Sequence, residues 1–218
     1  MERSIRILSD DEIETGALRI RKRSHRPLED LALYYMLFAT GARPLEIARL
    51  EVRDYLDEAR SVRRVSAMRM EVAITCRERP LYFRSARLDE VLDAYLAERV
   101  GGGAGLGVEE WYRGLSPGSR LFLSASGKGF QITRYGEEEQ RRFSCRGIQE
   151  TYRKLFRYAE FEGVTALTAR HTVADRLYRR GAEESQVGLL LGIADPSAVR
   201  QQYPRRGPTL DELVLNLV

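Results

Sequence analysis

The stretch from Pro27 to Gly41 constrains the fold most, because it defines one helix together with the residue that ends it. Pro27 breaks the basic tract before it. Apolar side chains then recur at helical spacing, at Leu31, Tyr35, Phe38 and Ala39. Gly41 follows as a residue that can take a positive φ and end a helix. We therefore predict a buried helix over residues 27–40.

Other segments also have the pattern of helices. Ser9 and Glu12 form a capping box, which predicts a helix running toward Lys22. Residues 85–100, 144–161 and 209–218 each place apolar side chains on one face, and Ser144 is the expected cap of the second of these. Because helical segments cover most of the chain, the fold is predicted to be mostly α.

A small antiparallel sheet is expected between the helices over residues 27–40 and 85–100. Residues 62–66 and 71–76 are rich in strand-forming residues, and residues 77–80 are the expected turn before Leu81. Residues 121–124 are predicted to form another short strand. The fold class is therefore a mostly α domain with a small antiparallel sheet, expected as a single domain over residues 1–218.

Composition places the chain among soluble globular proteins. Of its 218 residues 43% are hydrophobic and 31% charged, which is too apolar for a disordered chain. No apolar run approaches the ~20 residues that cross a bilayer, and the N-terminus does not open a signal peptide, so we expect a cytoplasmic protein without a membrane partner. Two cysteines and two histidines give neither a disulfide framework nor a metal-binding set. We expect no metal and no cofactor.

The basic residues are almost all arginines. Only three of the 36 are lysines, namely Lys22, Lys128 and Lys154. Arginine keeps its charge and binds phosphate with two parallel hydrogen bonds, so this bias suits a nucleic-acid partner. A GC-rich genome would produce the same bias without any function. Position is more informative: basic residues crowd residues 19–26, and Arg141, Arg142 and Arg146 form a second group.

The stretch from Leu167 to Tyr203 carries the most chemistry. Arg170 and His171 stand side by side, an amphipathic helix follows, and Leu-Leu-Gly precedes a lone tyrosine among Arg200 and other arginines. A tyrosine phenol, with an unperturbed pKa of about 10, is a poor nucleophile at neutral pH. Cationic neighbours would make such a tyrosine useful against a phosphate, so this stretch is typical of a phosphoryl-transfer site.

The chain resembles the catalytic domain of the tyrosine recombinases, the phage integrase family. The family's motif His-x-x-Arg-His-Thr, then Leu-Gly and the attacking tyrosine, is matched by Arg170, His171, Thr172, Leu191, Gly192 and Tyr203. Its earlier motif Thr-Gly-x-Arg-x-x-Glu is matched by Thr40, Gly41, Arg43 and Glu46. The resemblance covers roughly residues 7–205, in which the order of elements agrees, and leaves no room for the N-terminal DNA-clamping domain that most integrases carry.

The resemblance implies a site-specific recombinase. Arg43 and Arg170 would bind the scissile phosphate of double-stranded DNA, and Tyr203 would attack it to form a 3′-phosphotyrosine. Arg77 stands where the family has the hairpin lysine that protonates the leaving oxygen, with Arg79 as the next choice. Glu46 would orient a neighbouring helix or arginine. Partners would be a second copy on DNA or another recombinase, with the helix over residues 209–218 docking on a neighbour or on its own core.

Three positions depart from the family pattern. Leu167 and Ile193 replace a histidine and a histidine or tryptophan, and Arg77 replaces the lysine. Arginine is a poor general acid, so acid and base catalysis is weakened. Two hypotheses remain: a divergent recombinase that still cuts and rejoins DNA, or a DNA-binding scaffold or regulator that kept the fold. In either case His171, Arg200, Lys128 and Arg146 are the candidate substrate-binding residues, although solvent or packing explains each of them as well.

Overall fold

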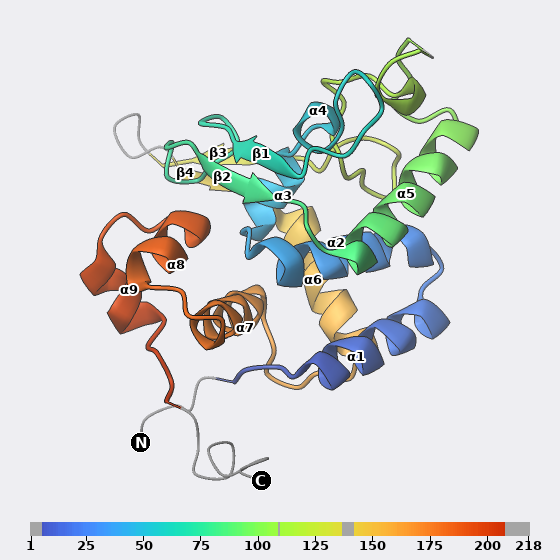
Figure 1. Ribbon diagram of the computed structural model, residues 1–218. Coiled ribbons are helices and arrows are strands. Elements are labelled where there is room, and N and C mark those ends of the chain that lie inside the picture. The colour runs from blue at the N-terminus through green and yellow to red at the C-terminus, as the bar shows by residue number, and fades with distance from the viewer. Residues whose placement is uncertain (1–5, 109, 137–141, 208–218) are drawn as a thin grey trace, which may run out of the picture.

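Helix α2 (Pro27–Thr40) lies in the middle of the helical core (Figure 1). The computed structural model describes residues 6–108, 110–136 and 142–207. Four helices pack around α2, namely α1 (Asp10–Arg23), α5 (Ala86–Gly101), α6 (Arg146–Tyr158) and α7 (Ala166–Arg179). The shorter helices are α3 (Pro44–Arg49), α4 (Val52–Tyr55), the 3-10 turn η1 (Tyr112–Gly114), α8 (Glu184–Leu191) and α9 (Pro196–Gln202).

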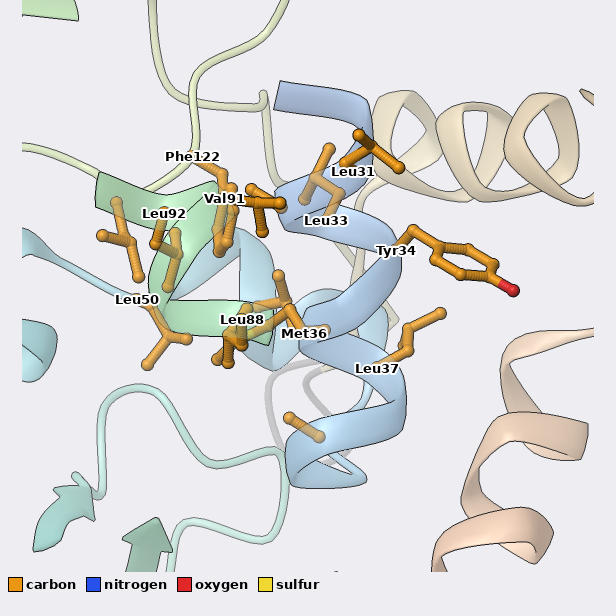
Figure 2. Packing of buried hydrophobic residues seen from close by; sticks show 14 of the residues in the cluster. Leu31, Leu33, Tyr34, Met36, Leu37, Leu50, Leu88, Val91, Leu92 and Phe122 are labelled. Atoms are coloured by element: carbon orange, nitrogen blue, oxygen red, sulfur yellow. The ribbon is translucent and has the colours of Figure 1, made fainter. Parts of the chain in front are cut away.

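Apolar packing of α2 on α5 makes up much of the core. Figure 2 shows Leu33 and Met36 of α2 facing Leu88 and Val91 of α5. Leu33, Met36 and Leu88 are fully buried, with 0% of their surface exposed. Burying a large apolar side chain stabilises a protein by roughly 1.5–3 kcal/mol. The helix predicted over residues 27–40 is thus confirmed as the central element of the core.

The predicted start of α1 and the predicted end of α2 are confirmed as well. Ser9 Oγ accepts a hydrogen bond from the Glu12 amide at 3.1 Å, and Glu12 Oε2 accepts one from the Ser9 amide at 2.8 Å, which completes the capping box of α1. Gly41 ends α2 in the left-handed conformation, with a φ of 63°. Ser85 caps α5 through the Leu88 amide.

Two small antiparallel sheets accompany the helices. Strand β1 (Val65–Met68) pairs with β2 (Arg79–Tyr82) so that Met68 is opposite Arg79, and β3 (Thr133–Tyr135) pairs with β4 (Arg142–Ser144). The predicted fold class, mostly α with a little antiparallel sheet, is confirmed.

The predicted strand boundaries were partly wrong. Residues 71–76 form turns instead of a strand, because the Val72 and Ala73 amides bond back to the Arg69 carbonyl at 3.0 and 2.9 Å. Arg79 and Pro80, which were predicted to belong to the turn, are the first two residues of strand β2 instead. Residues 121–124 make only an isolated bridge from Leu123 to Gly129.

Helix α6 also begins later than predicted. Ser144 is not its cap, because it belongs to β4 and pairs with Thr133 of β3. The helix starts at Arg146 after Cys145, which provides no side-chain cap.

The last three described helices form a small core of their own. Buried side chains of α7, α8 and α9 pack together, including Val173, Val187, Leu191, Val199 and Tyr203. Figure 1 shows α8 and α9 beside α7 and below the β1–β2 hairpin. Arg170 and Tyr203, two of the predicted site residues, lie where this cluster meets the main core.

The predicted helix over residues 209–218 and the basic residue Arg141 lie outside the described residues. None of the described helices is both long and apolar enough to cross a membrane.

Glu29 in the first turn of α2 predicts a pH-dependent stability. Burial raises the pKa of this carboxyl from 4.5 to about 7, against the opposing charge of Arg26. The folded protein therefore holds a proton that the unfolded chain releases, so the free energy of unfolding falls as the pH rises from 4.5 to about 7. Glu29→Gln removes this titration. We expect the melting temperature of this variant minus that of the parent, both measured by circular dichroism, to increase as the pH rises from 4.5 to about 7. A difference independent of pH would contradict the assignment.

Candidate active site

Arg43 stands in the turn between α2 and α3, held by its own helix start. Its backbone amide donates to Glu46 Oε2 at 2.9 Å, and its Nη1 lies 3.4 Å from Glu46 Oε1. The Thr40 hydroxyl accepts from the Ala42 amide at 3.2 Å and so fixes the turn. The Arg43 side chain is 26% exposed. The Arg43 backbone is therefore fixed, while its guanidinium can still reach a ligand.

Arg170 is the buried cation of the site. It is only 4% exposed, and three of its N–H groups are hydrogen-bonded. Nη1 donates to the Gly41 carbonyl at 2.5 Å, Nη2 to the Leu191 carbonyl at 2.9 Å and Nε to Tyr203 Oη at 3.0 Å. A guanidinium has five N–H donors, so two are left for a ligand. Burial lowers the pKa of Arg170, and the positive charge of Arg43 lowers it further.

Tyr203 follows α9 and is 3% exposed. Its amide donates to the Val199 carbonyl at 2.7 Å, which keeps the residue on the end of the helix. The sequence grouped it with Arg200 and its neighbours, but the cation that donates to its phenol is Arg170, 33 positions earlier. The phenol oxygen and the buried guanidinium are thus in direct contact.

His171 packs against the tyrosine. The centroids of the His171 and Tyr203 rings lie 4.7 Å apart, with the planes tilted by 45°. Burial lowers the pKa of His171, and the charges of Arg170 and Arg206 lower it further, so the imidazole is neutral at neutral pH. The sequence had favoured packing or a hydrogen bond over proton transfer, and a packing contact is what the structure contains.

Glu46 and Arg79 form a buried ion pair next to Arg43. Arg79 Nη1 and Nη2 donate to Glu46 Oε1 and Oε2 at 3.0 and 2.7 Å. Their side chains are 4% and 0% exposed. Burial raises the pKa of Glu46, but the Arg79 hydrogen bonds and charge outweigh it, and the net pKa is lowered. The sequence expectation that Glu46 orients a neighbouring arginine is consistent with this geometry.

Arg77 lies at the end of the turn before β2 and is exposed. It lines a cavity of about 400 Å³ that also contacts Ile193 and Gly192. Arg77 therefore lies near the position where the family has a histidine or tryptophan. Leu167, in the first turn of α7, is 55% exposed and fills no core position.

The other predicted binding residues lie on the surface. Lys128 and Arg146 both line a hollow of about 700 Å³, together with Ser124 and Ser126. Arg200 is exposed on α9. The roles assigned to these residues from the sequence stay predictions.

The sequence predicts Arg79 as the second choice for the leaving-group position, and the structure gives its guanidinium other partners. The Arg79 guanidinium is already committed to Glu46 and to the Leu190 carbonyl, at 3.0 Å from Nε. The residue before a proline is driven out of the helical region toward extended backbone, and Arg79 before Pro80 is extended at the start of β2.

The chain belongs to the phage integrase family, whose sequence model matches residues 6–208. Solved structures agree on the fold, which is that of the catalytic domains of tyrosine recombinases. The XerA recombinase superposes with a TM-score of 0.64 at 19% identity, over 95% of this chain and 61% of that one. No curated protein matches the sequence.

Two further solved structures were determined with DNA. The XerH site-specific recombinase, bound to a palindromic difH substrate after cleavage, gives a TM-score of 0.61 at 16% identity, over 94% of this chain and 50% of that one. The Tn1549 transposon integrase with circular intermediate DNA gives 0.61 at 16%, over 97% and 64%. This chain thus spans less than two thirds of the length of these relatives.

Gly192, at the end of α8, offers a test of the close packing around Arg79. It has a φ of 71°, and an added Cβ would lie 3.2 Å from Arg79 Cζ. Gly103 has the same φ of 71° with nothing within 4 Å of an added Cβ, so it is a matched control. We expect Gly103→Ala to lower the free energy of unfolding by about 1 kcal/mol through backbone strain. Gly192→Ala should lower it by roughly 1 kcal/mol more. If urea titrations give the same loss of unfolding free energy for both variants, the Arg79 side chain moves aside at no cost.

Proposed function

We propose that this protein cleaves and rejoins duplex DNA at specific sites through a 3′-phosphotyrosine on Tyr203. The observation that carries the proposal is the 3.0 Å contact between Tyr203 Oη and Nε of the buried Arg170. A buried guanidinium that touches a phenol and retains unused donors can bind the phosphate that the phenol attacks. Arg43 supplies a second cation two residues after Gly41, whose carbonyl accepts from Arg170 Nη1 at 2.5 Å.

In the proposed step the Tyr203 oxygen bonds to phosphorus while the bond from phosphorus to the 5′-oxygen breaks. The phenol loses its proton and the leaving 5′-oxygen gains one, so the step balances without a redox change. Arg43 and Arg170 would stabilise the extra negative charge on the non-bridging oxygens. Such preorganised donors are usually the largest catalytic contribution.

The reaction should be slow, because groups for proton transfer are missing. Leu167, Ile193 and Arg77 stand where the family has its acids and bases. General acid–base catalysis contributes typically ~10²–10⁴-fold. The charge-stabilising part of the site is present, so we expect slow cleavage and not its complete loss.

A nicked suicide substrate, from which the 5′-hydroxyl fragment diffuses away, tests this function. We expect a covalent protein–DNA adduct that forms slowly in the parent and is absent in Tyr203→Phe. Leu167→His, Ile193→His and Arg77→Lys together should accelerate its formation, by up to ~10²-fold or more. Denaturing gels of the labelled strand measure the rate.

The second candidate function is a DNA-binding scaffold without cleavage. Leu167 at the start of α7 is 55% exposed and has no group that could transfer a proton, which favours this second function. If neither the parent nor the restored variant forms an adduct on DNA that both bind, Tyr203 is structural and the scaffold function stands.

We propose that Lys128 and Arg146 bind phosphates of the DNA backbone other than the reacting phosphate. Each phosphate neutralised should contribute about −0.9 to the slope of log K against log salt. Replacing both residues by alanine should therefore make the slope shallower by roughly 1–2. The matched control removes two arginines with ion pairs elsewhere, Arg64 (with Asp89) and Arg87 (with Glu14). If fluorescence anisotropy titrations give the same change of slope for both double variants, Lys128 and Arg146 do not contact DNA. An affinity that does not change with salt would contradict DNA as the partner.

A further inference from the structure

Glu46 is the most heavily hydrogen-bonded carboxylate next to the site. Its two oxygens accept from Arg79 at 3.0 and 2.7 Å, from the Arg43 amide at 2.9 Å and from the Ile74 amide at 3.2 Å. A fully buried carboxylate needs such partners to stay ionised. Arg79 supplies the opposite charge, so the hold of Glu46 on Arg43 depends on Arg79.

Arg79 is also bound to the end of α8. Its Nε donates to the Leu190 carbonyl at 3.0 Å, and the next carbonyl, that of Leu191, accepts from Arg170 Nη2 at 2.9 Å. Two arginines from distant parts of the chain are thus seated on consecutive carbonyls. A helix C-terminus carries partial negative charge and unsatisfied carbonyls, which explains why both cations bind there.

These contacts form a continuous link between the two proposed phosphate ligands. It runs from Arg43 through Glu46 and Arg79 to the end of α8, and from there to Arg170. Bidentate pairing makes its central contact directional as well as strong. Arg79 is 6% exposed, and all three of its guanidinium nitrogens donate to other protein groups, so it acts on the site through those groups.

We infer that Arg79 is a positioning residue, which sets the placement of Arg43 relative to Arg170 for the phosphate. The inference rests on the proposed function of the site. It assigns Arg79 neither to the leaving group nor to DNA contact. A displacement of a reacting group by about 1 Å can lower a rate on the order of 10²-fold, so an indirect role can still have a large effect.

A purely structural ion pair would behave differently. Replacing a buried pair by apolar residues of similar volume is often neutral or stabilising. The double variant Arg79→Met with Glu46→Leu is therefore expected to fold with near-parental stability, even if Arg79→Met alone is less stable. If the pair only stabilises the fold, this double variant should be as active as the parent.

The first measurement needs no DNA. In Arg79→Met we expect hydrogen exchange of the Arg43 and Ile74 amides, measured by NMR, to be at least ~10-fold faster, since the Glu46 carboxylate has lost its main partner. The Ile47 amide, bonded to the Arg43 carbonyl at 3.0 Å within α3, is the internal control. Unchanged exchange at Arg43 and Ile74 would overturn the inference.

The second measurement is the rate of adduct formation at saturating suicide substrate. Arg79→Met, which keeps Glu46, and the double variant, each with its folding verified by melting, should both react roughly 10–100-fold more slowly than the parent. A parental rate would overturn the inference. If the parent itself forms no adduct, the proposed function fails on its own, and the exchange measurement alone decides the role of Arg79.

Discussion

The buried guanidinium of Arg170 is the interaction on which the rest of the site depends. It joins three segments, through the Gly41 carbonyl after α2, the Leu191 carbonyl at the end of α8 and the phenol of Tyr203. A buried cation without acceptors would cost several kcal/mol, so these partners must be in place when the protein folds. The cation therefore holds the small C-terminal cluster against the main core, and the same geometry forms the site.

Two glycines allow close packing around the end of α8. Gly41 has a φ of 63°, and an added Cβ would lie 2.7 Å from Leu191 Cδ2, so the turn that carries Arg43 packs directly on α8. Gly192 allows the opposite approach, of Arg79 to the helix end. Side chains thus pack closely against both glycines, Leu191 against Gly41 and Arg79 against Gly192.

The helices were predictable because their signals are local. The capping box of Ser9 and Glu12 and the positive φ of Gly41 depend on residues within a few positions. Strand pairing depends on partners that the sequence does not reveal, and the hairpin was therefore placed incorrectly around Arg79.

The site was predictable only in part. The residues Arg43, Arg170 and Tyr203 followed from motif resemblance, but the contact between Arg170 and Tyr203 did not. Arg79 binds a carbonyl 111 positions away, and no pattern near it indicates that partner. The contacts between residues of separate motifs could therefore be found only from the three-dimensional structure.

The most direct test of this account is a crystal structure of the protein with nicked duplex DNA and vanadate, which mimics the five-coordinate phosphorus of the transition state. The account predicts vanadium bonded to Tyr203 Oη, with the non-bridging oxygens held by Arg43 and Arg170. DNA bound with Tyr203 still buried against Arg170, and with no vanadium between them, would contradict it.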